Sequence, residues 1–204
     1  MITLYGSSRS RASRSLIALA ELGLAYRHVP LQPQRETRTD DFLRLNPNGR
    51  VPCLEDGGCI VWESFAINLH LAERYGTPPL LPATPEARAG ALQWSFWHAA
   101  EIEPVLISAA LAQQRGDGAA VLERRKVLME RLAVLDGWLS EREFLLGNVF
   151  AIADLNVASA FSEPHEDGRF AGWQDFDLAP LPRLERWLER CTSRASWARV
   201  RELP

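Results

Sequence analysis

The pattern of apolar and polar positions changes character once along the chain, near residue 80. Before that point, two short β-rich runs at residues 2–5 and 26–31 enclose a segment at 14–22 whose apolar residues recur at helical spacing. A strand, a helix and a second strand at this separation predict a βαβ unit with parallel strands. Gly23 directly follows the helical segment, as is typical of a residue that ends a helix.

The next stretch predicts a hairpin between two helices. Gly57-Gly58 has the composition of a two-residue hairpin turn. Ser64 is a good N-cap for the helix that follows the hairpin. The elements expected here are a short helix at 40–45, a turn at 46–49, strands at 53–56 and 59–62, and a helix from 64 to about 75. The complete order of this half is therefore βαβ-α-ββα.

A proline-dense segment at residues 78–85 separates this half from a purely helical one. Four prolines in eight residues oppose regular helix or sheet, so we place a linker there, between a domain at 1–77 and a domain at 86–204. Pro104 is expected to bend the first long helix of the second domain. The helices predicted in that domain cover residues 85–115, 119–139, 152–161 and 181–191.

Composition narrows the function classes. The chain has 204 residues and a net charge of −3, which is not the basic footprint of a nucleic-acid-binding protein. We find neither an apolar run long enough for a membrane span nor a signal peptide. Three cysteines are few, and an odd number cannot all pair, which argues against a disulfide framework. We therefore expect a reducing cytoplasmic location. Cys53 and Cys59, on the two hairpin strands, are expected to be small buried side chains.

The candidate chemistry lies on both sides of the hairpin. Val51 precedes Pro52, which pushes Val51 into an extended conformation, and we expect the bond between them to be cis with the Val51 backbone facing outward. Glu63 and Ser64 open the helix after the hairpin. The free N–H groups at a helix start attract a carboxylate, so this end suits an acidic small molecule. Each feature alone also has an alternative without function. Val51-Pro52 is then only the start of a strand, and Glu63-Ser64 only a capped helix start.

Together, Arg50, Val51, Pro52, Glu63 and Ser64 resemble the glutathione-binding half of a cytosolic glutathione transferase of bacterial type, without fixing the class. The resemblance implies that the Val51 backbone pairs with the cysteinyl part of glutathione, and that Glu63 and Ser64 hold its γ-glutamyl end. It also implies an α/β plus all-α fold, in which a thioredoxin-like N-terminal domain precedes a C-terminal helical bundle.

Glutathione chemistry requires a group that lowers the pKa of a thiol, ordinarily about 8.5. A hydroxyl donor to the thiolate does this, and by resemblance it follows the first strand and faces Val51. Ser10 falls where several bacterial classes place the catalytic residue, and Ser8 is the second candidate. Arg11 is a further possible donor, whereas Tyr5 belongs to the strand itself. A solvated Ser/Arg turn before a helix is the alternative without function.

The second domain offers fewer signals. Trp94, Trp97, His98 and Glu101 are expected on one helix face, and Trp97 is our candidate for the hydrophobic substrate site, although such a stripe is also typical of a core. Asp154 matches a structural Asp of the family. Its usual partner, a Ser or Thr, is replaced here by Ala151, which removes half of a capping box.

The resemblance predicts an enzyme that conjugates the glutathione thiolate to small, mostly apolar electrophiles in detoxification. The alternatives are a glutathione-dependent isomerase, dehalogenase or peroxidase on the same scaffold, or a binding module without turnover. Glutathione is the expected co-substrate, and we find no metal-ligand spacing in the sequence. By resemblance the protein is a homodimer, without a nucleic-acid or membrane partner.

Overall fold

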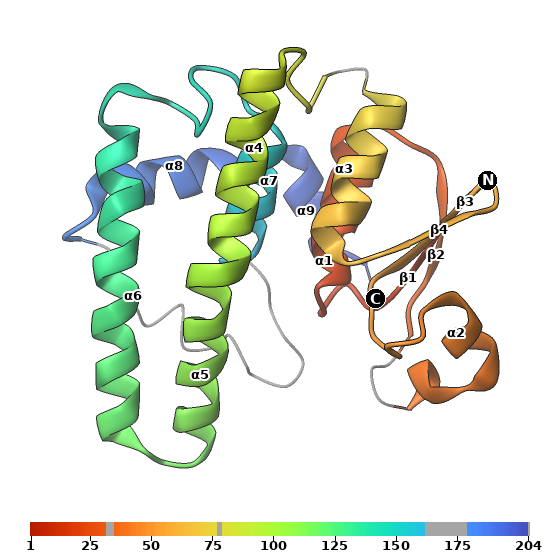
Figure 1. The fold of residues 1–204 in the computed structure, drawn as a ribbon, viewed down its shortest axis with the longest axis horizontal. Coiled ribbons are helices and arrows are strands. Elements are labelled where there is room, and N and C mark those ends of the chain that lie inside the picture. Colours follow the sequence, from red (N-terminus) through yellow and green to blue (C-terminus); the bar gives the residue numbers. More distant parts are fainter. Residues whose placement is uncertain (32–34, 77–78, 162–178, 204) are drawn as a thin grey trace. The chain divides into compact units, whose positions relative to one another are not determined.

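The computed structural model describes residues 1–31, 35–76, 79–161 and 179–203 (Figure 1). The chain forms two compact units. Unit 1 contains residues 1–81 together with 193–204, and unit 2 contains residues 82–192. Each unit has its own buried apolar core.

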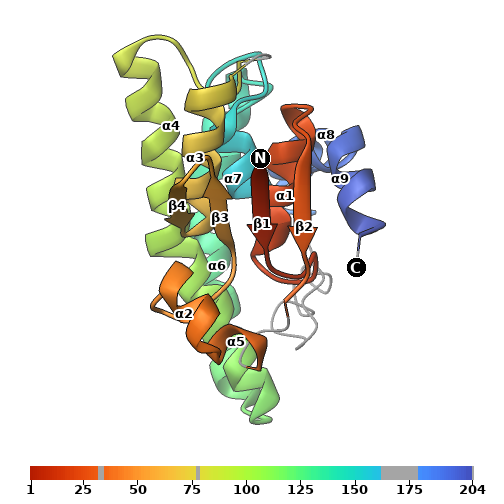
Figure 2. The ribbon, with the colours of Figure 1, turned by 90° about the vertical axis from the view of Figure 1, so that its right-hand side faces the viewer.

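Unit 1 is built on a four-stranded sheet with the order β2-β1-β3-β4 (Figure 2). The parallel pair β1–β2 confirms the predicted βαβ unit, and the antiparallel pair β3–β4 confirms the hairpin. β1 and β3 are central and antiparallel to each other. The strands are β1 (Ile2–Tyr5), β2 (Tyr26–Val29), β3 (Cys53–Asp56) and β4 (Cys59–Trp62).

The helices α1 and α3 pack against each other and contact the central part of the sheet (Figure 1). Leu16, Leu19, Ile67 and Leu71 are fully buried, as expected for the apolar stripes of these helices. This arrangement is a thioredoxin-like domain, as predicted. The helical segments of unit 1 are α1 (Ala12–Glu21), the 3₁₀ turn Glu36–Arg38, α2 (Asp40–Leu45), α3 (Ser64–Tyr75) and α9 (Ala195–Arg201).

Two local predictions in unit 1 are wrong. Ser64 is not the N-cap of α3 but its first residue, because Glu63 already accepts the Ile67 N–H through its carbonyl at 2.9 Å. Cys59 is exposed rather than buried, because β4 is an edge strand, whereas Cys53 on the inner strand β3 is fully buried. Burial and the nearby Glu55 carboxylate raise the pKa of the Cys53 thiol to about 11.

The end of the chain differs from the predicted division. We expected residues 86–204 to form one helical domain, but residues 193–204 group with unit 1. The physical reason is that α9 packs along α1 and buries Trp197 and Val200. The first part of the predicted linker, Pro78, lies outside the described residues.

In the described part of unit 2 the regular structure is helical, apart from one isolated β-bridge between Phe144 and Gly147. The long helix predicted at 85–115 is interrupted by a π-helical turn, which ends two residues before Pro104 (Figure 1). A proline has no N–H and its ring collides with the carbonyl four residues earlier, so a wider turn relieves this conflict. The elements are α4 (Pro85–Trp97), the π turn His98–Ile102, α5 (Glu103–Gln114), α6 (Gly118–Trp138), the 3₁₀ turn Leu139–Glu141, α7 (Ile152–Ser159) and α8 (Pro182–Thr192).

α7 lies at the core of unit 2, and all of its residues are buried. Asp154 in its first turn is fully buried and its carboxylate accepts three hydrogen bonds, from Ala151 N at 3.0 Å, Leu145 N at 2.8 Å and Trp187 Nε1 at 2.8 Å. The Ala151 bond is the remaining half of the capping box. The other two bonds connect α7 with the preceding loop and with α8.

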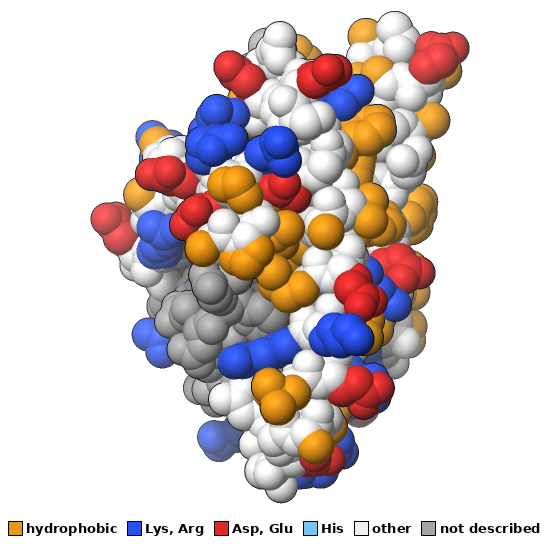
Figure 3. Space-filling view, turned by 90° about the vertical axis from the view of Figure 1, so that its left-hand side faces the viewer, with side chains coloured by type: hydrophobic (Ala, Val, Ile, Leu, Met, Phe, Trp, Pro, Cys, Tyr) orange, Lys and Arg blue, Asp and Glu red, His pale blue; other side chains and the backbone are white. Residues whose placement is uncertain are grey.

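The surface carries both signs of charge. Figure 3 shows Lys and Arg interspersed with Asp and Glu, with apolar side chains gathered between them. Phe96, Leu122 and Val134 are among the large apolar side chains that are well exposed in unit 2. In the described part of the chain, no helix combines the length and the apolar character needed to cross a bilayer.

Candidate functional site

The turn before Val51 is fixed by a buried asparagine. The Asn46 side chain donates to the Arg50 carbonyl at 2.7 Å and accepts from the Asn48 N–H at 3.0 Å. Gly49, with φ of +59°, bonds back to the Asn46 carbonyl, and a side chain here would collide with the Thr37 carbonyl. Arg50 itself is exposed. The turn therefore delivers the chain into Val51 in one defined geometry.

The peptide bond between Val51 and Pro52 is cis, as expected. Val51 is half-buried and Pro52 is buried. β3 begins only at Cys53, which pairs with Tyr5 of β1, so Val51 lies outside the paired strand and beyond the end of β1.

Gly6 brings the loop after β1 into contact with Val51. Its φ is +131°, and a Cβ placed on it would lie 2.9 Å from the Val51 Cβ and 2.7 Å from the Ala12 Cβ. Real Cβ atoms do not approach so closely, so only glycine fits between Val51 and the start of α1. β2 holds the glycine from the other side, since Gly6 N donates to the Val29 carbonyl at 2.9 Å and the His28 ring bonds the Gly6 carbonyl at 2.8 Å.

Two candidate hydroxyls occupy this loop in different states. Ser8 is buried and donates its hydroxyl proton to the Leu203 carbonyl at 2.8 Å. Ser10 is half-buried and donates to the Ser7 carbonyl at 2.7 Å, while accepting from the Ala12 N–H at 3.2 Å. A hydroxyl that accepts from a helix N–H is a better donor in turn. The acceptor of the Ser10 hydroxyl, the Ser7 carbonyl, is therefore local. A rotation of this hydroxyl would let it donate to a bound anion instead.

Tyr5 does not face this loop as a free donor. Its hydroxyl donates to Glu55 Oε2 at 3.1 Å, and its ring lies edge-on to Phe42. Burial and the Glu55 carboxylate raise the pKa of the Tyr5 hydroxyl above its usual value. This agrees with the expectation that Tyr5 is part of the first strand rather than the donor to a thiolate.

The start of α3 forms the other side of the site. Glu63 adopts φ of 74° and ψ of 119°, a conformation rare for a residue with a side chain, and its carboxylate is exposed. Ser64 is buried, and its carbonyl accepts from the Ser15 hydroxyl of α1 at 3.5 Å. The bend turns the chain from β4 into α3 and places the helix start, whose first N–H groups have no acceptor within the helix itself, next to α1.

Arg14 is a residue that the sequence reasoning did not single out. It lies in the first turn of α1, is 1% exposed, and places its guanidinium 5.3 Å from the centre of the Phe65 ring at the start of α3. Its place just before Leu16 and Ile17, on a helix expected to be buried, was the available signal, since arginine is rarely buried unless it is paired. This buried guanidinium thus lies beside the start of α3, where the helix dipole also carries partial positive charge.

Unit 1 thus brings together the loop that carries Ser8 and Ser10, the Val51 turn, and the helix start at Ser64. Trp97 belongs to unit 2, where it is half-buried and lies edge-on to Trp94 at 5.2 Å. Of the predicted stripe, Trp94 and His98 are buried, whereas Glu101 turns outward to pair with Arg131 at 3.1 Å. The π-helical turn changes the helical register here, which explains the difference.

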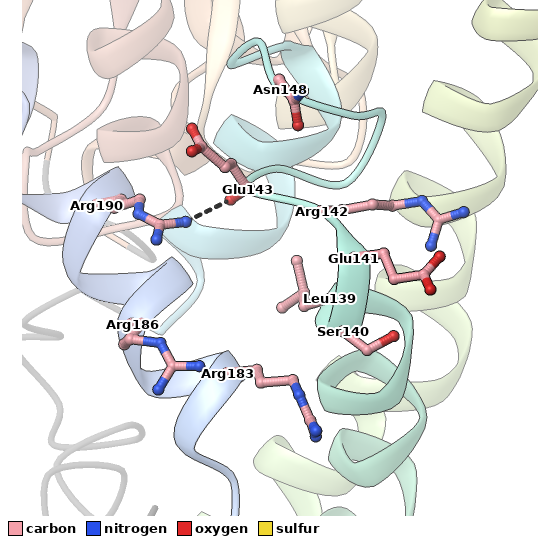
Figure 4. A pocket seen from close by; sticks show the side chains of 9 residues that line it. All are labelled: Leu139, Ser140, Glu141, Arg142, Glu143, Asn148, Arg183, Arg186 and Arg190. Carbon is pink, nitrogen blue, oxygen red and sulfur yellow. Dashed lines mark hydrogen bonds between the residues drawn. The ribbon is translucent and has the colours of Figure 1, made fainter.

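A cavity of about 250 Å³ in unit 2 contains none of the candidate residues (Figure 4). Its arginines are largely engaged: Arg190 donates to the Glu143 carbonyl, Arg183 pairs with Asp136, and Arg142 stacks on Trp138. Among the described residues, no group of His, Cys, Asp and Glu could hold a metal ion. The cavity is lined by Leu139, Ser140, Glu141, Arg142, Glu143, Asn148, Arg183, Arg186 and Arg190.

Two protein-family models match the chain. Residues 1–73 match the N-terminal domain of glutathione S-transferases, and residues 98–195 match the C-terminal domain of the same proteins.

Individual relatives match over all or nearly all of the chain. Glutathione S-transferase GstB of Escherichia coli K12 is 30% identical, covering 100% of this chain and 99% of the relative. A theta class glutathione S-transferase from Xanthomonas axonopodis pv. citri, solved with glutathione bound, has a TM-score of 0.84 at 28% identity, covering 97% of this chain and 95% of that one. The transferase URE2P6 from Phanerochaete chrysosporium, in complex with oxidized glutathione, has a TM-score of 0.82 at 28% identity, covering 98% and 94%.

Proposed function

Because the chain belongs to the glutathione S-transferase family, we propose that it is an enzyme that joins the thiolate of glutathione to an electrophilic carbon of a small, mostly apolar compound. The observation that carries the proposal is the contact of Gly6 with Val51, which sets the Ser10 loop beside a backbone outside the paired strand. The nearby start of α3 supplies a seat for negative charge.

The cysteinyl part and the γ-glutamyl end of the tripeptide each have a matching group in unit 1. The Val51 backbone pairs with the cysteinyl part of glutathione, beside the cis bond to Pro52. The γ-glutamyl carboxylate receives N–H groups from the start of α3 at Ser64, where the helix dipole supports it. The exposed carboxylate of Glu63 binds the α-ammonium of the same γ-glutamyl group. Arg50, which is exposed on the turn before Val51, is a further candidate for binding glutathione.

Ser10 is the proposed thiolate partner. When glutathione binds, the Ser10 hydroxyl rotates from the Ser7 carbonyl to the sulfur, and the thiol proton leaves to solvent. A hydroxyl that donates to the thiolate lowers the pKa of the thiol and so raises the thiolate fraction at neutral pH. The thiolate then forms the C–S bond while the leaving group departs with the electron pair. We prefer Ser10 to Ser8, whose proton is held by the Leu203 carbonyl.

The electrophile is proposed to bind at the helical unit. Trp97 combines a large apolar ring with partial exposure, which suits an apolar substrate.

We also propose that the protein is a cytoplasmic homodimer, as the family resemblance implies. Exposed apolar side chains at Ile60 and Trp62 on β4 and at Phe96 on α4 are suited to such an interface. Analytical ultracentrifugation decides this point, and a monomer at micromolar concentration contradicts it.

The test of the function begins with binding. Calorimetry with glutathione and with S-methylglutathione separates recognition of the tripeptide from the chemistry of its sulfur. Both compounds are expected to bind, and only glutathione is expected to release a proton near neutral pH. A conjugation assay then uses a nitro-activated aryl halide, with isomerisable keto acids, alkyl halides and peroxides as further arms. Failure of glutathione to bind at millimolar concentration contradicts the proposal, and turnover only in another arm redirects it to that reaction.

A further inference from the structure

The C-terminal segment, residues 193–203, lies along α1. It belongs to unit 1, and its helix α9 packs against α1. Trp197, which is 2% exposed, and Val200 form the buried side of this contact. A segment this well packed has one defined position relative to α1.

One end of the segment is held at the C-terminal end of α1. Arg194 binds the Glu21 carboxylate through two hydrogen bonds, Nε to Oε1 at 2.8 Å and Nη2 to Oε2 at 2.7 Å. The Ser196 hydroxyl donates to Oε1 of the same carboxylate. Paired donors of this kind fix orientation as well as distance. We call Glu21, Arg194 and Ser196 the clamp.

The other end of the segment reaches the loop that precedes α1. The Leu203 carbonyl accepts the Ser8 hydroxyl proton at 2.8 Å, and the Leu203 N–H donates to the Val200 carbonyl at 3.2 Å. Since Arg194 lies at the end of α1 and Leu203 near its beginning, the segment runs antiparallel to α1. It therefore connects the clamp to the serine loop across the length of this helix.

Ser8 is connected to Ser10 through a single peptide group. The Ser7 carbonyl and the Ser8 N–H belong to the same planar peptide, so fixing Ser8 fixes the direction of the Ser7 carbonyl. That carbonyl accepts both the Ser10 hydroxyl at 2.7 Å and the Ser10 N–H at 3.1 Å. The position of the Leu203 carbonyl is thereby transmitted to the hydroxyl that is proposed to meet the thiolate.

We propose that the C-terminal segment positions the Ser10 hydroxyl for catalysis, with Ser8 and Arg194 as positioning residues. This inference rests on the proposed function, because it assigns the segment a role in the reaction of the same site. Ser8 neither touches the substrate nor donates to its sulfur. It holds the loop so that Ser10 meets the thiolate at hydrogen-bonding distance, and the clamp holds Leu203 where Ser8 needs it.

The test measures the pKa of the glutathione thiol in the complex by its ultraviolet absorbance, together with kcat and the KM for glutathione. In Ser8→Ala the thiol pKa is expected to rise and kcat to fall about tenfold at neutral pH, since small misplacements of reacting groups have effects of this order. The KM for glutathione is expected to stay nearly constant, because the Val51 and Ser64 sides are intact. Ser8→Thr, which keeps the hydroxyl, is expected to restore the wild-type thiol pKa.

A clamp variant tests the remote end. Arg194→Ala is expected to raise the thiol pKa in the same direction as Ser8→Ala, and Arg194→Lys to have a smaller effect. The matched control is Ser159→Ala, which removes another buried hydroxyl that donates to a backbone carbonyl, but in unit 2. Thermal unfolding of every variant is recorded, and Ser8→Ala carries the decision because it leaves the ion pair of the clamp intact.

A double-mutant cycle separates this inference from the proposed function. If Ser8 acts through Ser10, Ser8→Ala has no further effect on the thiol pKa in a Ser10→Ala background. If Ser10→Ala raises the thiol pKa while Ser8→Ala leaves it and kcat at wild-type values, the positioning role is overturned and the donor role of Ser10 stands. If Ser10→Ala leaves the thiol pKa unchanged, the donor assignment fails, and the positioning role fails with it.

Discussion

The first N–H groups of α1 and α7 find their hydrogen-bond acceptors in different ways. Among the described residues, neither helix has a side-chain hydrogen bond from its N-cap position, which is Arg11 in α1 and Ala151 in α7. Both therefore depend on polar side chains at neighbouring positions. At α1 these are hydroxyls, and one of them, Ser10, is half-buried. At α7 it is the carboxylate of Asp154, which is fully buried.

The difference shows what each site is suited to do. A hydroxyl donates one proton that rotates between acceptors, so Ser10 can exchange the Ser7 carbonyl for a ligand at little cost. The Asp154 carboxylate receives three N–H groups at once, and moving it would leave all of them unpaired. The start of α1 thus suits the proposed chemistry, and the start of α7 suits a structural role.

The largest expected effect is on the stability of unit 2. Asp154→Ala leaves the N–H groups of Leu145, Ala151 and Trp187 buried without their acceptor, so the free energy of unfolding should fall by about 3 kcal/mol or more. Urea unfolding followed by tryptophan fluorescence measures this. The control is Asp117→Ala, which removes an exposed N-cap that accepts from Ala120 N at 3.0 Å and should cost about 1 kcal/mol. Equal losses in the two variants would remove the distinction between buried and exposed caps.

Ser10→Ala should affect activity and leave stability nearly unchanged. Removal of a donor to a developing or bound anion typically lowers kcat about 10²-fold. The free energy of unfolding should change by less than about 1 kcal/mol, because the Ser10 hydroxyl bonds only to its own loop. Steady-state kinetics with glutathione and an activated aryl halide, beside urea unfolding, give both values. Wild-type kcat in this variant would mean that another group supports the thiolate, and Ser10→Thr serves as the hydroxyl-bearing control.

The change of the unfolding free energy with pH should be smaller than these two effects. Folding raises the pKa of one buried carboxyl group and lowers that of others, so their contributions partly cancel. Burial raises the pKa of Asp154 from 3.8 to about 6 despite its N–H donors. Between these two values the folded protein keeps a proton that the unfolded chain has lost, so the contribution of Asp154 to stability falls as pH rises through this window.

Two carboxylates with cationic partners should behave in the opposite way. Burial raises the pKa of Glu21 and of Asp56, but Arg194 and Ser196 at Glu21, and His70, Tyr75 and Arg74 at Asp56, outweigh burial and lower both pKa values. Their contribution is present above the unfolded pKa and is lost as pH falls through the folded one.

Comparison of wild-type protein with Asp154→Asn isolates the Asp154 contribution to the pH response. The unfolding free energy of the wild-type protein minus that of Asp154→Asn should be largest near pH 4. This difference should fall as the pH approaches 6 and should then stay constant. Urea unfolding at a series of pH values measures it. A difference that grows with pH would mean that the N–H donors outweigh burial at Asp154.

The smallest expected effect is a gain. Ala151 has φ of −136° and ψ of 176°, which is the extended conformation of an N-cap residue. Ala151→Ser restores a hydroxyl that accepts the Asp154 N–H and completes the capping box, so stability should rise by about 1 kcal/mol. Thermal and urea unfolding measure the gain, with Ala151→Gly as the comparison. A loss of stability would show that the buried site has no room for the hydroxyl.

The sequence by itself determined the local features of this protein. Alternating and helical periodicities predicted the βαβ unit and the hairpin, because these depend on residues close together in the chain. The Asn46 turn, the cis bond before Pro52 and the two serine candidates were also accessible, since each reflects local backbone chemistry or a resemblance carried by neighbouring residues.

Only the tertiary structure decided how these features are used. The bond from Ser8 to Leu203 joins residues 195 positions apart, so no local pattern predicted that a distant carbonyl holds Ser8 whereas Ser10 bonds only within its own loop. The assignment of α9 to unit 1 and the burial of Arg14 likewise depend on contacts between distant segments. Local propensity selects which elements form, but packing between segments far apart in sequence sets which polar groups are saturated and which remain available for chemistry.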